Sequence, residues 1–159
     1  MNAADILKQI TPQLESDLPE LDAQVILAHV MGHPRTWLLA HLETSLTPLQ
    51  IDQTKEAVNQ YQAGTPLPYI IGHWEFYGLD LYITKDVLIP RPETELLVEK
   101  AISWLRASPE RRTVADIGTG SGAIAVTLAM HVPDARILAT DVSFAALKIA
   151  KYNAQKFHV

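Results

Sequence analysis

The 159-residue sequence has no cysteine, no long apolar run and no surplus of positive charge. Without cysteine the chain forms no disulfide and offers no thiolate to a metal, which leaves its compartment open. Its uninterrupted apolar stretches stay well short of the ~20 residues that a membrane-spanning helix needs. The N-terminus also lacks the cationic start and apolar core of a signal peptide. These absences predict a soluble, cytoplasmic protein without a membrane partner.

The charge balance excludes another class of protein. The net charge is −5, from 13 Lys and Arg against 18 Asp and Glu, and the two signs are interleaved. A strongly basic nucleic-acid-binding protein would look different, so we expect no direct nucleic-acid contact. The six histidines are scattered without the spacing of a zinc site, and we expect no metal. What is present is 48% apolar residues, enough for a buried core.

Three segments of the chain differ in pattern. Residues 1–68 predict a helical bundle, with one helix between Pro19 and Gly32 and another capped by Thr47 and ended by Gly64. A second segment, 69–90, is rich in aromatic and β-branched residues and predicts a β-hairpin turning near Gly78. The third, 91–159, alternates strands and helices in the order of a doubly wound domain. The predicted fold class is therefore α/β.

The third segment carries a series of expected elements. They are a helix from Pro92, a strand over 113–117, a helix over 121–130, a strand over 136–141 and a helix over 144–156. In the first of these helices, Leu97, Ala101 and Leu105 are expected to lie on one face. The short apolar strands are typical of a parallel sheet that is buried on both faces.

A glycine loop follows the first of these strands, in the stretch VADIGTGSGAIAVTLA (residues 114–129). Gly118, Gly120 and Gly122 allow the backbone to turn tightly and to approach a ligand at the N-terminus of the next helix. The same letters fit the looser dinucleotide fingerprint G-x-G-x-x-G/A, with Asp141 as the acid at the end of the second strand.

Asp116, two positions before the first glycine, separates the possible ligands. A carboxylate at this place repels a pyrophosphate in a site of low dielectric, but attracts a cofactor with ammonium and sulfonium groups. S-adenosylmethionine is such a cofactor and has no phosphate, while Asp141 suits ribose hydroxyls in either case. The pattern favours S-adenosylmethionine over a nicotinamide or flavin dinucleotide. A turn without any ligand fits three glycines and two acids poorly.

The chain resembles the HemK/PrmC-type protein-(glutamine) methyltransferases, which modify peptide chain release factors. The stretches GTPLPYIIGHWEFYG, VLIPRPETELLVEKAI, VADIGTGSGAIAVTLA and ATDVSFAALKIAKYNA carry the resemblance, and the arginine-proline segment is its most specific part. The resemblance implies a helical substrate-recognition domain over 1–68, a β-hairpin linker over 69–90, and the first part of a Rossmann-like S-adenosylmethionine methyltransferase domain over 91–159. With two of about seven strands present, much of the strand surface is expected to lack cover.

The resemblance also implies an activity and a set of site residues. A monomeric enzyme would transfer a methyl group from S-adenosylmethionine to the glutamine side-chain amide in the Gly-Gly-Gln motif of class I release factors. By matching motif positions, the cofactor site would hold Asp116, Gly118, Thr119, Gly120, Ser121, Gly122 and Asp141, and the substrate pocket Arg91, Pro92, Thr94 and Glu95.

One family motif is missing from the sequence. The acceptor-binding Asn-Pro-Pro-Tyr does not occur, and Asn153 is not a substitute because no Pro-Pro follows it. We therefore assign no catalytic residue and expect the 159-residue chain alone to be inactive, whether as a fragment, a truncated form or a shortened gene product.

Two other functions stay open at this point. One is an amino methyltransferase that acts on nucleic acid or a ribosomal protein, although the acidic balance and the segment IPRPETE argue against nucleic acid. The other is a non-catalytic remnant whose helical domain still binds a release factor. It predicts binding without turnover.

Overall fold

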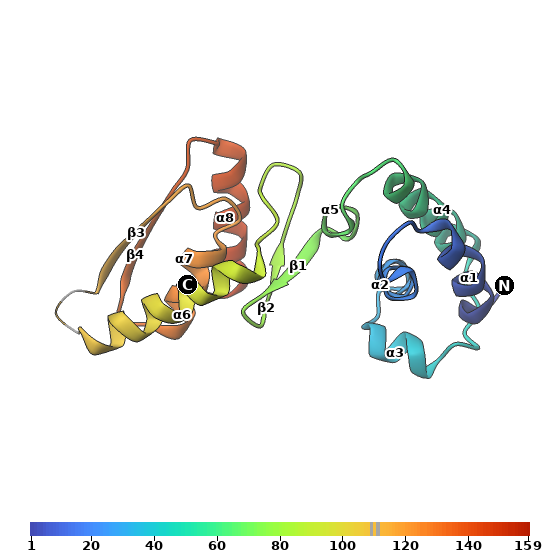
Figure 1. The fold of residues 1–159 in the computed structure, drawn as a ribbon, viewed down its shortest axis with the longest axis horizontal. Helices are drawn as coiled ribbons and strands as arrows, with labels where there is room; N and C mark the ends of the chain where they lie inside the picture. The colour runs from blue at the N-terminus through green and yellow to red at the C-terminus, as the bar shows by residue number, and fades with distance from the viewer. Residues whose placement is uncertain (109, 111) are drawn as a thin grey trace. The chain divides into compact units, whose positions relative to one another are not determined.

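The computed structural model describes residues 1–108, 110 and 112–159. These residues form two compact units, Met1–Ile71 and Gly72–Val159 (Figure 1). The second unit includes the β-hairpin. The predicted division into 1–68, 69–90 and 91–159 gives each segment a role in addition to its boundaries, and this division stays a prediction.

The first unit is built from helices. They are α1 (Ala3–Ile10), a short 3-10 helix (Thr11–Gln13), α2 (Pro19–Met31), α3 (Arg35–Ala40), α4 (Pro48–Gln62) and α5 (Leu67–Ile71). The predicted helical character of the N-terminal region is confirmed. The five-residue helix α5 was not predicted, because two prolines and a short length leave it without a clear helical period.

Local signals fix the ends of the longer helices. The Thr47 side chain accepts a hydrogen bond from the Gln50 N–H at 3.2 Å, and the Gln50 side chain accepts one from the Thr47 N–H at 3.0 Å. This capping box pairs backbone donors that the first turn of α4 would otherwise leave free. Helix α2 ends at Gly32, whose φ of 70° lies in the left-handed region that favours glycine.

The first unit has a core of its own. Fully buried side chains come from α2 and α3, including Ile26, Leu27 and Leu38, and α1 and α4 pack against them. At the edge of this core, Tyr61 donates a hydrogen bond to the Asp22 carboxylate at 2.7 Å, which joins α4 to α2. Burial and this hydrogen bond raise the pKa of Tyr61.

The second unit combines a hairpin with an α/β layer. Strands β1 (His73–Phe76) and β2 (Leu79–Tyr82) pair antiparallel, and β3 (Thr113–Ile117) pairs parallel with β4 (Arg136–Thr140). The helices are α6 (Pro92–Ala107), α7 (Ala123–His131) and α8 (Phe144–Lys156). This order confirms the predicted α/β class and the start of a Rossmann-like domain. Helix α7 begins later than the predicted residue 121, because Gly122 has a left-handed φ of 81°.

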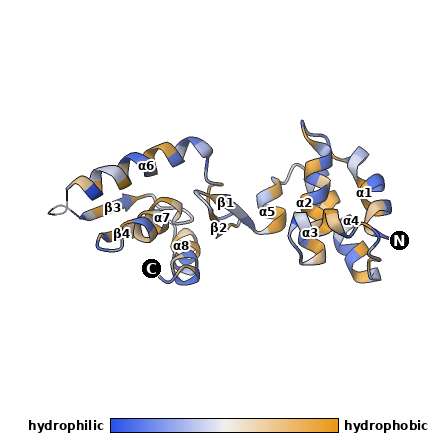
Figure 2. Cartoon of the chain, turned by 90° about the horizontal axis from the view of Figure 1, so that it is seen from below, coloured by the Kyte–Doolittle hydropathy of each residue, from blue (hydrophilic) through white to orange (hydrophobic). Residues whose placement is uncertain are grey.

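The buried face of α6 includes Leu105 but not Leu97. Val98, Ile102 and Leu105 are buried, whereas Leu97 is 56% exposed. Two successive four-residue steps drift around a helix with 3.6 residues per turn, and a four-residue step followed by a three-residue step stays on one face. Hydrophilic and hydrophobic residues alternate along α6 as an amphipathic helix requires (Figure 2).

The two parallel strands are covered on one face. Exposure alternates along most of β3 and β4, and Ile137 and Ala139 line a cavity of about 320 Å³ together with residues of α7 and α8. On the other face Ile117 is 85% exposed and Leu138 is 60% exposed. For the described residues, the prediction of burial on both faces is therefore wrong, and the prediction that strand surface lacks cover is confirmed.

Candidate functional site

The glycine loop, residues 118–122, connects β3 to α7 at the carboxyl ends of the two parallel strands. The Gly118 and Thr119 N–H groups both donate to the Thr140 carbonyl, at 2.8 and 2.9 Å. The loop is thereby fixed to the end of β4, beside Asp141. In open α/β sheets this end of the strands is where ligands bind.

The three glycines have different surroundings. All have positive φ, at 80° for Gly118, 56° for Gly120 and 81° for Gly122. A Cβ atom placed on Gly118 or Gly120 would meet no atom within 4 Å, so the backbone there faces open space. On Gly122 it would lie 3.1 Å from the Cα and Cβ of Ala150. The first two glycines leave room for a ligand, and the third allows α7 and α8 to pack closely.

Two carboxylates stand on either side of the loop. Asp116 accepts a hydrogen bond from the buried Thr119 hydroxyl at 2.6 Å. Asp141 accepts from the Gly120 N–H through Oδ2 and from the Ser143 N–H through Oδ1, each at 2.9 Å. These backbone hydrogen bonds, first that from Ser143 and then that from Gly120, lower the pKa of Asp141, so they favour its charged form.

The loop and its two acids suit one kind of ligand chemistry. An ionised carboxylate only accepts hydrogen bonds, and each of its oxygens has room for more than one donor. Asp116 and Asp141 can therefore accept from ammonium or hydroxyl groups while they keep their present partners. A phosphate would be repelled by both charges.

The predicted substrate-pocket residues lie together at the start of α6. Arg91 is the exposed N-cap residue, Pro92 follows at the first helical position, and the Thr94 N–H donates to the Arg91 carbonyl at 3.0 Å. Glu95 accepts from the Tyr77 N–H at the hairpin turn, at 2.9 Å. In the described part of the chain, no hydrogen bond joins these four residues to the glycine loop.

A cavity of about 370 Å³ opens between the hairpin and this helix start. Its lining consists of Trp74, Glu75, Phe76, Pro90, Pro92 and Glu95. Two of the four predicted pocket residues, Pro92 and Glu95, thus border a hollow surface, and the hairpin supplies half of its wall.

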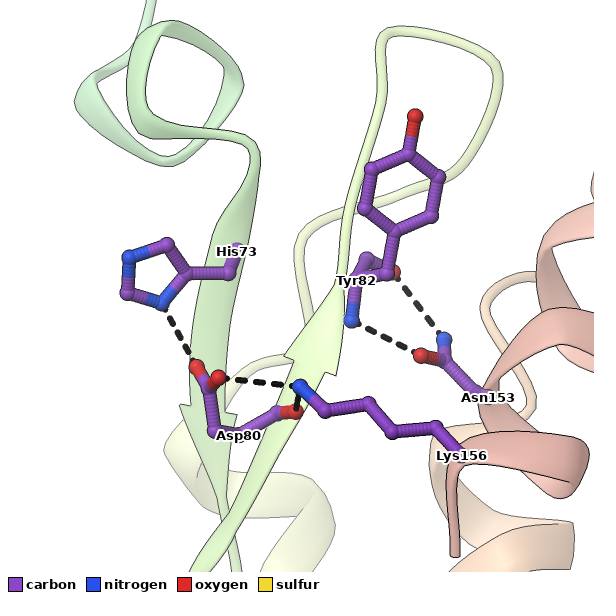
Figure 3. A network of polar contacts seen from close by, with 5 residues as sticks. All are labelled: His73, Asp80, Tyr82, Asn153 and Lys156. Atoms are coloured by element: carbon purple, nitrogen blue, oxygen red, sulfur yellow. Dashed lines mark hydrogen bonds and ion pairs between the residues drawn. The ribbon is translucent and has the colours of Figure 1, made fainter. Parts of the chain in front are cut away.

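Asn153 is a residue of this unit whose role the sequence did not reveal. It is fully buried on α8, its Oδ1 accepts from the Tyr82 N–H at 2.7 Å, and its Nδ2 donates to the Tyr82 carbonyl at 3.0 Å (Figure 3). Nδ2 also donates to the Ser121 carbonyl in the glycine loop at 2.9 Å. Its place four residues after Ile149, on the apolar face of the helix, was a signal that could have singled it out.

The hairpin is also attached to α8 by charged groups (Figure 3). Lys156 reaches the carboxylate of Asp80 at 2.9 Å and also donates to its carbonyl, and His73 Nδ1 lies 2.6 Å from the same carboxylate. Partial burial alone would raise the pKa of Asp80, but the hydrogen bonds from Lys156 and His73 outweigh it and lower that pKa.

The described residues include no group of three or more His, Asp or Glu side chains that could hold a metal ion. No described helix combines the length and the apolar character needed to cross a membrane.

Comparison with known proteins adds a second line of evidence. Residues 5–72 match the family model of the PrmC N-terminal domain, and residues 93–159 match that of the methyltransferase small domain. A release factor glutamine methyltransferase of Bordetella pertussis is 48% identical over 141 residues, which cover 87% of this chain and 51% of the relative.

Two further similar proteins are also named release factor glutamine methyltransferase. The Escherichia coli protein is 41% identical over 150 residues, covering 94% of this chain and 53% of its own length. The Coxiella burnetii protein is 42% identical over 161 aligned residues, which cover 100% of this chain and 58% of the relative. The chain thus spans about half the length of the curated relatives it matches.

Proposed function

The chain belongs to the PrmC family of release factor glutamine methyltransferases, and from this premise we propose that the protein methylates the side-chain amide of a glutamine in class I peptide chain release factors. The glutamine is that of the Gly-Gly-Gln motif. The methyl donor is S-adenosylmethionine, and the enzyme acts as a cytoplasmic monomer.

The observation that carries the proposal is the glycine loop between two carboxylates. Gly118 and Gly120 face open space, Asp116 and Asp141 flank them, and the loop backbone is fixed by Thr140. S-adenosylmethionine has an ammonium group, a sulfonium group and ribose hydroxyls, and it has no phosphate. The residues present therefore fit this cofactor better than a dinucleotide.

Each predicted cofactor residue has a separate task in this proposal. Asp116 attracts the ammonium group, and Thr119 holds the Asp116 carboxylate in place. Asp141 accepts from ribose hydroxyls, and its hydrogen bonds to the Gly120 and Ser143 N–H groups hold its carboxylate in place. Ser121 and Gly122 contribute through the loop backbone and its packing against α8.

The reaction asks mainly for positioning. Bound S-adenosylmethionine supplies an electrophilic methyl group on a positively charged sulfur. A carboxamide nitrogen is a weak nucleophile because its lone pair is delocalised into the carbonyl, so the protein must hold it in line and stabilise the charge that develops. We assign this holding to Arg91, Thr94 and Glu95 at the start of α6, of which Glu95 lines the cavity of about 370 Å³. The first unit, as the recognition domain, would contact the release factor.

The proposal is tested by cofactor binding and by methyl transfer, at the length of the protein found in its own cells. Asp116→Asn keeps the size of the side chain and removes its charge. We expect it to weaken S-adenosylmethionine binding about tenfold in calorimetry, since tenfold corresponds to about 1.4 kcal/mol, a reasonable loss for one ion pair in a partly shielded site.

Asp134→Asn is the matched control, because Asp134 pairs with Arg112 at the other end of the strands. It should leave cofactor affinity unchanged. Transfer of labelled methyl to a release factor, and its loss when the Gly-Gly-Gln glutamine is replaced, would support the acceptor. Transfer to ribosomal protein or nucleic acid instead, or release-factor binding without any transfer, would contradict it.

A further inference from the structure

Asn153 uses its carboxamide in one orientation only. Both hydrogens of Nδ2 are donated, to the carbonyls of Tyr82 and Ser121, and Oδ1 accepts from the Tyr82 N–H. A flipped amide would turn its oxygen toward two carbonyl oxygens. An aspartate would do the same and would add a charge in a fully buried position.

Asn153 therefore connects two parts of the chain that have no direct hydrogen bond to each other in the described residues. Tyr82 ends β2, and Ser121, itself buried, belongs to the glycine loop. The other anchors of the loop, Thr140 and Asp141, belong to β4 and its end. Asn153 thus supplies the anchor that links the loop to the hairpin.

The hairpin continues this connection toward the start of α6. At its turn, the Tyr77 N–H donates to Glu95, and the rings of Tyr77 and His131 pack nearly perpendicular with centroids 5.1 Å apart. The hairpin is thus attached at Tyr77 and, through Asn153, at Tyr82. Its other strand lines the cavity of about 370 Å³ with Trp74, Glu75 and Phe76. One path of contacts thus runs from the glycine loop through Asn153 and the hairpin to Glu95.

We propose that Asn153 is a positioning residue that couples the glycine loop to the β-hairpin, so that cofactor binding at the loop stiffens the hairpin and orders the cavity beside α6. The proposal rests on the proposed function in one respect, that the loop holds S-adenosylmethionine. Asn153 itself touches neither the cofactor nor the acceptor. It acts through the Ser121 carbonyl on one side and the Tyr82 backbone on the other.

Backbone hydrogen exchange measures this coupling directly. In the protein at its native length, we expect saturating S-adenosylmethionine to slow amide exchange at Tyr82 and Tyr77 by about fivefold, because local opening of the hairpin becomes rarer. Calorimetry on the same sample establishes saturation. The readout does not depend on methyl transfer.

The variants separate coupling from simple attachment of the hairpin. Asn153→Asp should abolish the cofactor-dependent slowing at both amides, and Asn153→Ala, which introduces no charge, repeats the test if the first variant does not fold. Lys156→Ala is the matched control, since Lys156 lies on the same helix and holds the same hairpin through Asp80 without a bond to the loop. Exchange should be faster overall in this control, with the fivefold slowing by cofactor retained.

Each result has a clear meaning. Slowing that persists in a folded Asn153 variant saturated with cofactor overturns the proposal, as does a wild-type protein that binds the cofactor without any slowing at Tyr82. Loss of the slowing in Lys156→Ala to the same degree as in Asn153→Ala would reduce Asn153 to one of several attachments, and would also overturn it. A wild-type protein that fails to bind S-adenosylmethionine overturns the proposed function first, and the coupling with it.

Discussion

Gly118 and Gly122 have nearly the same φ, 80° and 81°, and differ in what surrounds them. A side chain on Gly118 would point into open space, whereas one on Gly122 would press on the backbone of Ala150 in α8. A substitution at Gly118 would introduce backbone strain alone, whereas one at Gly122 would add steric overlap to that strain. The contrast distinguishes a glycine that faces open space from a glycine that allows close helix packing.

We expect Gly122→Ala to lower the free energy of unfolding by about 2–5 kcal/mol, from left-handed strain of about 1–2 kcal/mol and overpacking of about 1–3 kcal/mol. Gly118→Ala should cost about 1–2 kcal/mol, the strain alone. Urea denaturation of the two variants measures the difference. Equal losses would mean that α7 and α8 separate easily enough to admit a methyl group.

The contacts of Asp80 predict that the free energy of unfolding depends on pH. Hydrogen bonds from Lys156 and His73 lower its pKa in the folded state. A lowered pKa means that the folded state favours the charged carboxylate. Its contribution to stability is therefore complete above the unfolded pKa of about 3.9 and is lost as pH falls through the folded pKa.

The measurement is the difference in unfolding free energy between wild type and Asp80→Asn across pH 2 to 7. We expect wild type to be more stable above about pH 5, with the difference shrinking below about pH 4 as the carboxyl takes up a proton. A difference that stays constant down to pH 2 would contradict this. It would show that the attachment of the hairpin does not depend on the charge of Asp80.

At the scale of elements, the ends of helices follow from a few side chains close in sequence. Helix α4 starts with a reciprocal pair, Thr47 and Gln50, and with Pro48 at its first position. Helix α8 starts in a similar way, with the Ser143 hydroxyl accepting from the Ala146 N–H at 3.2 Å. Such contacts span three residues, so they form as soon as the helix does.

Thr47→Ala should lower the stability of the first unit by about 1 kcal/mol, because it leaves a backbone donor of α4 without its partner. Thr36→Ala, at an exposed position inside α3, serves as the control and should change stability by less than about 0.5 kcal/mol. Thermal unfolding followed by circular dichroism is sufficient for both. A Thr47 variant as stable as the control would indicate that solvent replaces the capping box without cost.

At the scale of the whole molecule, the first unit buries apolar surface without help from the rest of the chain. Every residue of its buried cluster lies between Ala3 and Val58, and the partly buried side chains packed against it end at Ile70. A unit of this size can fold alone when its core is complete, although with little stability to spare.

We therefore expect residues 1–71, produced alone, to give a helical circular dichroism spectrum and a single cooperative thermal transition. Leu27→Ala in this fragment should remove about 2–5 kcal/mol, enough to unfold a marginal domain, because Leu27 is fully buried. Gradual loss of helix without a transition, in the unsubstituted fragment, would show that the first unit needs the second.

Much of the candidate site was predictable from the sequence. Asp116, the three glycines and Asp141 belong to a pattern that strand and helix lengths alone bring to one end of a parallel sheet. The sequence could not tell which glycines face open space and which one packs against a helix, because that depends on Ala150 in α8. It placed Arg91 to Glu95 at a helix start correctly, but it did not link Glu95 with the hairpin turn.

The sequence by itself determined the features that form within a few residues. They are the helix caps, the hairpin turn at Gly78, the alternation of strands and helices, and the acidic residues beside the glycine loop. Only the tertiary structure decided which face of α6 is buried and what Asn153 does. Asn153 meets Tyr82 across 71 positions of the chain. Contacts over such distances depend on how whole elements pack, and no local pattern records them.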